Sequence, residues 1–318
     1  MDKRVEAGKP NVVQPSITLP DLITPFSDED ACKGFLRDVR WPNGVQCPRC
    51  GNVGVYELKA RPFHWQCQAP KCGNPPDGRK NRGYRFSVTT GTIFENTKYP
   101  LRTWFQVAYL MCQSKKGMSA LQIHRQIKSG DYRTAWFMCH RLRAAMKNQT
   151  FTRLIGEVEV DEAYIGGKNV NRHWDKKTPY KAGGISSGKI GVIGAISRKG
   201  NVVCQMIENT DTDTLTGFVN TVTSDKVELV ATDEHKGYDA IEVYGSKHEV
   251  VKHSQGEYVR GKVHTNNIES FWALLKRGII GTYHNVGKGY LPLYLNEFTF
   301  RHNNRRNAEI FTTLISSC

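Results

Sequence analysis

The spacing of apolar residues changes character near residue 150 of this chain. Before that point they recur mainly at helical spacing, as in the run from Leu101 to Gln113 that follows Pro100. After it, apolar and polar residues first alternate as in β-strands. The second part predicts strands at 156–161, 190–196, 202–207, 227–232 and 249–251, and helices at 213–222, 236–241 and 263–277. This order predicts an α/β domain that begins with three strands and ends with a helix.

Two shorter helices are predicted between residues 119 and 147. Ser119 can cap the first, Ser129-Gly130 interrupts it, and the second begins at Arg133. This pattern is typical of a helix-turn-helix, whose second helix enters the major groove of DNA. The candidate DNA contacts on or near the second helix are Arg133, Arg141 and Arg143. An ordinary helical hairpin with solvated basic residues would show the same pattern.

The distribution of charge favours the DNA-binding interpretation. The whole chain carries a net charge of +15. Residues 79–147 contain fourteen Lys or Arg and two acids, so this segment alone contributes +12. A concentrated positive charge of this kind indicates a polyanionic partner, most often nucleic acid. We therefore expect double-stranded DNA to bind this part of the chain.

Other compositional features narrow the class of protein. The chain has no run of 18 apolar residues and no N-terminal secretion signal, so we expect a cytoplasmic, nucleoid-associated protein. The prolines at 10, 15 and 20, among polar residues, predict a mobile N-terminal tail at 1–26. Nine cysteines without a secretion signal favour metal binding over disulfides for any that cluster.

Four of these cysteines have the spacing of a zinc site. Cys47 and Cys50 are followed by glycine, and sixteen residues separate them from Cys67, with Cys72 five positions further on. Four thiolates complete a tetrahedral Zn²⁺ site, and four protein ligands leave no open position, so the metal is expected to be structural. The wide second pair leaves open whether His64 replaces one thiolate.

Short strands are expected around these cysteines, as a zinc ribbon requires. The strands are predicted at 53–58, 63–67, 84–88 and 92–94, after a short capped helix at 27–37. We therefore predict a zinc ribbon region at 27–97, a helical helix-turn-helix domain at 98–150 and an α/β domain at 151–318.

Acidic residues lie at two notable places on the predicted strands. Period-two alternation places Glu157, Glu159 and Asp161 on one face of the first strand. Asp233 follows directly after the nearly continuous apolar strand at 227–232, at a strand end where open α/β sheets place their chemistry. Acids in such positions are costly unless they are exposed or used.

The helix at 263–277 supplies a third acid. Its two asparagines, Asn266 and Asn267, are suitable caps for free helix N–H groups, and Trp272 belongs to its apolar stripe. Glu269 and Lys276 lie seven residues apart on one face. Lys276 is a candidate contact for a DNA phosphate.

Together, these acids predict a divalent metal site. Three carboxylates, Asp161, Asp233 and Glu269, would repel each other at one sheet edge unless cations lay between them. Oxygen ligands favour Mg²⁺ or Mn²⁺. Two such ions can activate a water or a 3′-hydroxyl and stabilise the leaving oxygen of a phosphodiester.

This arrangement resembles the DDE transposases and integrases with a ribonuclease-H-like core. Several runs in the same order are similar to bacterial insertion-sequence transposases related to the Merlin elements. They are F-S-V-T-T-G-T-I-F at 86–94, V-E-V-D-E-A-Y-I-G-G-K at 158–168, T-D-E-H-K-G-Y at 232–238, H-T-N-N-I-E-S-F-W-A-L-L-K-R at 264–277 and G-T-Y-H at 281–284. The similarity spans about residues 30 to 310.

The resemblance implies a ribonuclease-H-like, mixed-sheet catalytic domain after the zinc ribbon and the helix-turn-helix. It implies a metal-dependent transposase that binds the terminal inverted repeats of its mobile element, cleaves phosphodiesters and transfers strands into target DNA. A homodimer or larger assembly on DNA is expected by analogy. The alternative is a DNA-binding regulator with the same two N-terminal modules and an inactive C-terminal domain.

The third acidic position stays open within this family, where asparagine can fill the role. Asn266 lies one helical turn before Glu269, so either residue could complete the metal site. We prefer Glu269 because its charge suits Mg²⁺ better. The 35 residues between Asp233 and Glu269, and the following Lys276, also match the DDE pattern.

Overall fold

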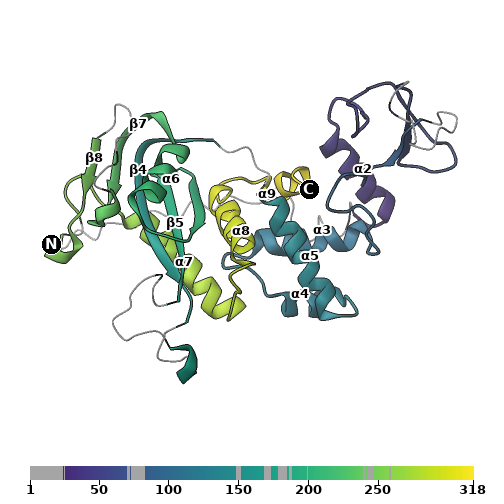
Figure 1. The fold of residues 1–318 in the computed structure, drawn as a ribbon. Helices are drawn as coiled ribbons and strands as arrows, with labels where there is room; N and C mark the ends of the chain where they lie inside the picture. The colour runs from purple at the N-terminus through teal and green to yellow at the C-terminus, as the bar shows by residue number, and fades with distance from the viewer. Residues whose placement is uncertain are drawn as a thin grey trace, which may run out of the picture. The chain divides into compact units, whose positions relative to one another are not determined.

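The computed structural model describes residues 24, 26–69, 72, 83–147, 152–167, 173–177, 185, 188–198, 200–238, 241, 247–257 and 259–318. The chain divides into two compact units (Figure 1). One contains the residues up to 109 together with the segment 304–316, and the other contains residues 110–303. Nearly all of the tail predicted at 1–26 lies outside the described residues.

Helices and aromatic rings form the core of the first unit. Helix α2, Glu29–Arg40, begins at Asp28, whose carboxylate accepts a hydrogen bond from the N–H of Ala31 at 2.7 Å. It packs against α9, Ile310–Ser316, near the start of α3, Leu101–Gln113. The rings that join these helices, with centroids 5.0–6.1 Å apart, are Phe26, Phe35, Phe105 and Phe311.

A small antiparallel sheet completes this unit. Its strands are β1, Val55–Glu57, β2, His64–Cys67, and β3, Arg85–Ser87, in that order across the sheet. Trp65 of β2 is buried, with its ring 6.0 Å from that of Phe86. The three strands lie close to where the sequence predicts them.

The fourth strand predicted in this region, at 92–94, is wrong. These residues form consecutive turns after Gly91, which has a positive φ of 77°. The hydroxyl of Thr92 donates to the carbonyl of Thr89 at 2.7 Å and accepts from the N–H of Phe94 at 3.0 Å. A threonine side chain that bonds to nearby backbone groups in this way competes with strand pairing.

The second unit is built on a mixed five-stranded sheet in the order β6-β5-β4-β7-β8. Strand β5 is antiparallel to β4 and β6, whereas β7 is parallel to both β4 and β8. The strands are β4, Leu154–Ile165, β5, Ile190–Ser197, β6, Val202–Ile207, β7, Thr223–Thr232, and β8, Lys247–Val250. All five strands occur close to the predicted positions, as does the mixed α/β character.

Helices cover both faces of this sheet. Helix α6, Thr212–Val222, packs on the face that carries the inward valines of β4. Helices α7, Asn266–Gly278, and α8, Leu291–Asn303, pack on the other face. Trp272 of α7 is buried against β5, where Gly194 leaves room for its ring: an added Cβ would lie 2.6 Å from it. Trp272 is therefore a core residue, as the periodicity predicts.

The two helices predicted between 119 and 147 are present in the second unit. Helix α4, Ala120–Ile127, is capped by Ser119, and α5, Tyr132–Ala145, is capped by Asp131. The turn between them contains Gly130 with a φ of 73°, the left-handed conformation that favours glycine. The break expected at Ser129-Gly130 is confirmed.

A buried ion network connects α5 to α8. Glu297 of α8 is fully buried and accepts hydrogen bonds from Nε of Arg143 at 2.6 Å and from the hydroxyl of Tyr283 at 2.9 Å, and it pairs with Arg301. Burial alone would raise the pKa of Glu297, but Arg301 and Arg143 outweigh it and bring the pKa to about 2. The helical pair is thus fixed to a helix that packs on the sheet.

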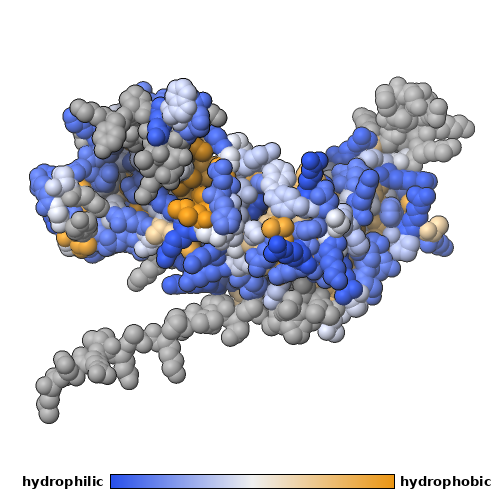
Figure 2. All heavy atoms as spheres, turned by 90° about the horizontal axis from the view of Figure 1, so that it is seen from below, coloured by the Kyte–Doolittle hydropathy of each residue, from blue (hydrophilic) through white to orange (hydrophobic). Residues whose placement is uncertain are grey.

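The surface seen in Figure 2 is mainly hydrophilic, with apolar residues in small patches. Among the described residues, no helix is long and apolar enough to cross a membrane.

Candidate functional site

Two of the predicted catalytic acids lie side by side at one edge of the large sheet. Glu159 of β4 pairs in register with Ala231 of the parallel strand β7. Two residues further along, Asp161 therefore lies beside Asp233, which directly follows β7. One carboxylate oxygen of each of Asp161, Glu162 and Asp233 lies within 4.8 Å of the others.

Glu162 is a member of this cluster that the alternation rule does not predict. Adjacent residues of a strand point to opposite faces, so alternation alone would place Asp161 and Glu162 apart. Glu162 instead accepts a hydrogen bond from the hydroxyl of Tyr238, which follows Asp233 in the short helix η4, Lys236–Tyr238. The sequence feature that could have indicated this role of Glu162 is that it directly follows another acid, Asp161.

The electrostatics of the cluster favour a bound cation. Burial raises the pKa of Asp161 to about 7, and the negative charges of Asp233, Glu162 and Glu269 add to this effect. Burial likewise raises the pKa of Glu162, although the Tyr238 hydroxyl opposes the shift. A divalent cation would relieve this repulsion, and all the donors are carboxylate oxygens of the kind that Mg²⁺ and Mn²⁺ prefer. The residues present therefore fit such an ion.

The third predicted acid lies near this cluster but not within it. Glu269 is in the first turn of α7, is exposed and accepts a hydrogen bond from the hydroxyl of Thr265 at 2.7 Å. Asn266 is also exposed, at the start of the same helix. Lys276 is exposed on the last turn. Both candidates for the third ligand, Glu269 and Asn266, thus lie exposed on the first turn of α7.

The start of α7 differs from the expectation that its asparagines act as caps. Asn266 and Asn267 are already helical, and Thr265 in the N-cap position makes no capping bond with its side chain. The carboxylate of Glu159, on strand β4, accepts the N–H groups of Asn267 and Ile268 instead. The cap therefore comes from a residue 108 positions earlier in the chain.

The four predicted zinc ligands meet in the first unit. The Sγ atoms of four cysteines all lie within 4.8 Å of one another: Cys47, Cys50, Cys67 and Cys72. The Sγ atoms of Cys47 and Cys72 are 3.5 Å apart, and those of Cys50 and Cys67 are 3.7 Å apart. Four thiols at one centre fit a tetrahedral Zn²⁺ ion. Although four residues separate Cys67 from Cys72, both sulfurs reach the cluster.

The surroundings of Cys67 favour its thiolate, whereas burial raises the pKa of Cys47 and of Cys72. Burial acts to raise the pKa of Cys67, but the N–H of Ala69 and the amide of Asn52 donate to its sulfur and bring the pKa down to about 7. His64 is not part of the cluster, because its Nδ1 lies 3.0 Å from the carbonyl of Pro62. The alternative in which His64 replaces a thiolate is therefore wrong.

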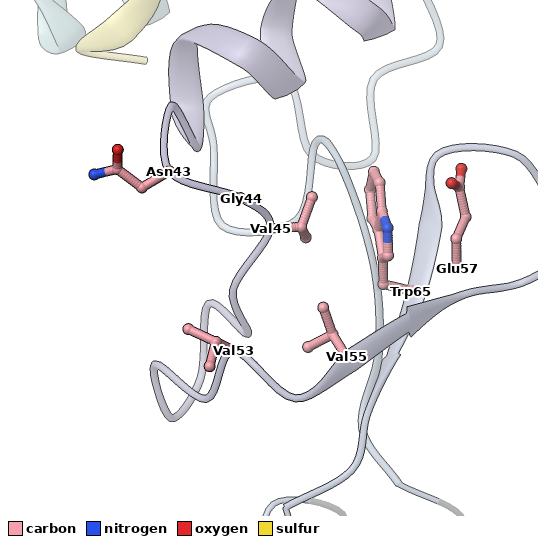
Figure 3. A pocket seen from close by; sticks show the side chains of 7 residues that line it. All are labelled: Asn43, Gly44, Val45, Val53, Val55, Glu57 and Trp65. Carbon is pink, nitrogen blue, oxygen red and sulfur yellow. The ribbon is translucent and has the colours of Figure 1, made fainter.

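A shallow hollow of about 310 Å³ lies beside β1 and β2 of the ribbon (Figure 3). Valine and tryptophan side chains form part of its wall, and Val53 is 76% exposed at its surface. The single carboxylate in its lining, Glu57, accepts a hydrogen bond from the N–H of Phe63 at 2.7 Å. The hollow therefore contains no set of groups suited to catalysis.

The three arginines proposed to contact DNA differ in position. Arg133 is exposed on the first turn of α5, and Arg141 is half-buried with its guanidinium 5.6 Å from the ring of Phe137. Arg143 is only 1% exposed and pairs with Glu297. A guanidinium enclosed in this way cannot reach a phosphate, so the expectation that Arg143 contacts DNA is corrected.

Comparison with known families finds one match in each unit. Residues 153–303 match the ISXO2-like transposase domain, and residues 27–74 match the transposase zinc-ribbon domain. A transposase domain belongs to an enzyme that cleaves and transfers DNA. The predicted resemblance to insertion-sequence transposases is therefore confirmed as a resemblance of domains. The chain is also similar to an uncharacterized protein in transposable element ISH50 of Halobacterium salinarum, with 25% identity over 288 residues, 88% of this chain and 92% of that protein. A bacterial origin and a relation to Merlin elements stay predictions.

The zinc site leads to a first prediction. The full chain should contain one Zn²⁺ per molecule, and Cys67→Ser should lose it and loosen the small sheet, because the metal joins β2 to the Cys47 knuckle. Elemental analysis measures the metal, and amide hydrogen exchange compares 47–67 with 154–165. Cys204→Ser, outside the cluster, is the control and should retain zinc. Absence of stoichiometric zinc in the wild type would refute the site.

A second prediction concerns pH. Because the pKa of Asp161 is raised to about 7, the proton is fully bound well below that pH and must leave before a cation binds. The affinity for Mn²⁺ should therefore fall about tenfold for each pH unit below about 7 and level off above it. Calorimetry of the full chain with MnCl₂ measures this change. An affinity that stays constant from about pH 8 to about pH 6 would contradict it.

Proposed function

We propose that this chain is a metal-dependent DNA transposase that cleaves phosphodiesters at the ends of a mobile element and joins them to target DNA. The observation that carries the proposal is the meeting of Asp161 and Asp233 at one sheet edge, inside the segment that matches a transposase domain. The strand order, with β5 antiparallel to its neighbours and β7 and β8 parallel to β4, supports a ribonuclease-H-like core.

The residues of this edge have distinct proposed roles. Asp161 and Asp233 bind the divalent cations, and Glu269 completes the ligand set, with Asn266 as the alternative. When bound, such ions activate a water or a 3′-hydroxyl and stabilise the leaving oxygen. Lys276, on the last turn of α7, is proposed to contact a phosphate near the scissile bond.

The N-terminal half of the chain is proposed to recognise the terminal inverted repeats. Helix α5 presents Arg133, Phe137 and Arg141 along one side, as a recognition helix in the major groove requires. The zinc ribbon adds a second module, and Zn²⁺ has a structural role there. Because two element ends must be brought together, we propose a homodimer or larger assembly on DNA in the cytoplasm, at the nucleoid.

The central test uses purified full chain and DNA carrying the terminal repeats with Mg²⁺. Asp161→Asn and Asp233→Asn should reduce cleavage by about 1,000-fold or more, because each removes a charged metal ligand. Both should bind the repeats as well as the wild type. Cleavage by either variant at the wild-type rate would refute the enzymatic function.

The same assay separates the two candidates for the third ligand. Glu269→Gln should lose as much activity as Asp161→Asn, whereas Asn266→Ala should lose about tenfold or less. The reverse order would assign the third position to Asn266.

A further prediction separates the two kinds of arginine on α5. Arg133→Ala should weaken repeat binding by about tenfold without changing the unfolding midpoint, since its side chain is exposed. Arg143→Ala should instead destabilise the fold by about 3–5 kcal/mol, because it leaves Glu297 buried with one arginine fewer. Fluorescence anisotropy and urea unfolding measure the two effects. An Arg143→Ala protein as stable as the wild type would contradict this assignment.

A further inference from the structure

The N-terminus of α7 obtains its hydrogen-bond partners from another part of the sheet. A helix leaves its first N–H groups without internal partners, and a side chain in the N-cap position usually supplies them. The side chain of Thr265 makes no capping bond, and its hydroxyl donates to Glu269 instead. The helix that carries the third metal-ligand candidate thus depends on another residue for its cap.

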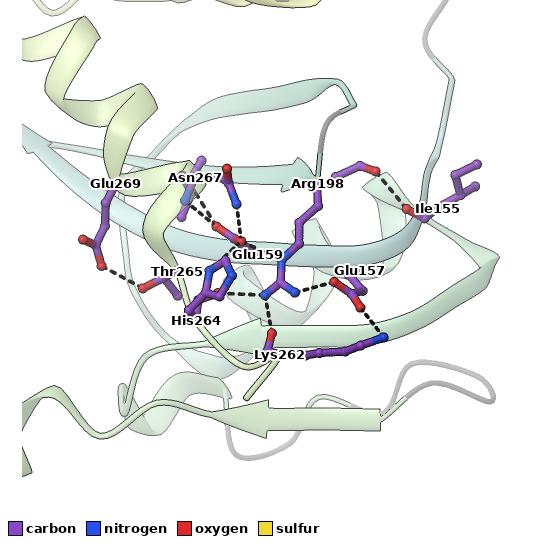
Figure 4. A network of polar contacts seen from close by, with 11 residues as sticks. Ile155, Glu157, Glu159, Arg198, Lys262, His264, Thr265, Asn267 and Glu269 are labelled. Carbon is purple, nitrogen blue, oxygen red and sulfur yellow. Dashed lines mark hydrogen bonds and ion pairs between the residues drawn. The ribbon is translucent and has the colours of Figure 1, made fainter. Parts of the chain in front are cut away.

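Glu159 supplies the cap (Figure 4). Its carboxylate is completely buried and accepts the N–H of Asn267 at 2.8 Å, the N–H of Ile268 at 3.2 Å and the side-chain amide of Asn267 at 2.7 Å. Nδ1 of His264 lies 3.1 Å from the same group. A negative charge at a helix N-terminus is favourable because it faces the positive end of the helix dipole.

Arg198 supplies the compensating charge. Its Nε donates to Glu159 at 2.9 Å, and one terminal nitrogen donates to Glu157 on the same strand. The other terminal nitrogen donates to the carbonyls of Lys262 and His264, in the segment that leads into α7 (Figure 4). The planar guanidinium can satisfy all these acceptors at once because its donors form a rigid fork.

The position of Glu159 connects this network to the metal site. Glu159 lies two residues before Asp161 on the same face of β4. The first turn of α7, which Glu159 caps, carries both candidates for the third ligand, Asn266 and Glu269. Glu159 therefore joins the strand of Asp161 to this turn, and Arg198 bonds to the segment that enters the helix.

We propose that Glu159 and Arg198 are positioning residues for the metal centre, which act by setting the first turn of α7 against Asp161. This inference rests on the proposed function, because it assigns a role in the same centre. Neither residue is proposed to touch the metal or the DNA. Their loss should lower metal affinity even though Asp161, Asp233 and Glu269 are all present.

The test compares Arg198→Met and Glu159→Gln with the wild type, as full chains without DNA. Free Mn²⁺ is measured by electron paramagnetic resonance during titration with MnCl₂, and the exchange of the Asn267 and Ile268 amides is measured in parallel. Both variants should bind Mn²⁺ about tenfold or more weakly, as is typical when a residue that orients a ligand is lost, and both amides should exchange faster.

The matched control is Arg260→Met, which removes an arginine from the segment that leads into α7. Arg260 is half-exposed and pairs with Glu249 and Glu257, away from the helix cap. It should retain wild-type Mn²⁺ affinity and amide protection. Glu159→Gln keeps the shape of the side chain, so it provides the decisive comparison if Arg198→Met fails to fold.

Two outcomes would overturn the positioning role. One is Mn²⁺ affinity in folded Glu159→Gln within about twofold of the wild type. The other is faster amide exchange with unchanged Mn²⁺ affinity, which would make the network a simple helix cap. Neither measurement involves DNA cleavage, so the result is separate from the proposed function. A wild-type chain that binds Mn²⁺ through Asp161 but cleaves no repeat DNA would refute the function alone.

Discussion

The parallel pairing of β4 with β7 is the constraint on which the rest of the second unit depends. It brings Asp161 and Asp233 together at a sheet edge, where their charges repel and burial raises the pKa of Asp161. A fold does not gain stability from such an arrangement, because like charges at a half-buried site cost free energy. The surrounding elements therefore hold together a group of acids whose repulsion a bound cation would relieve.

Three buried or half-buried acids of this unit, Glu297, Glu159 and Asp161, differ in the groups that surround their negative charge. Glu297 is neutralised by two arginines and a tyrosine, and Glu159 by one arginine and the N-terminus of a helix. In both cases the chain itself supplies the positive charge that burial requires. Asp161 has neighbouring carboxylates instead, and among the described residues no basic side chain forms an ion pair with it. This contrast distinguishes a structural acid from one that is available to a metal.

Most of the helices, strands and metal-ligand candidates that depend on the local spacing of residues were predicted from the sequence. Strand alternation placed β4 and its acids, apolar periodicity placed α3 and α7, and cysteine spacing brought four thiols to one centre. Contacts between distant residues were not predictable in this way. Arg143 has the position of a DNA contact along its helix, but its partner Glu297 lies 154 residues later in the chain. The cap of α7 by Glu159 and the turn that replaced a strand at Thr92 likewise depend on partners that periodicity does not reveal.

The burial of Arg143 also has a geometric meaning. Its pair with Glu297 joins α5 to α8, and α8 packs on β6, so the helical pair is connected to the sheet through packed side chains. In the proposed DNA complex, this packing would set the number of base pairs between the sequence bound by α5 and the bond placed at the carboxylates.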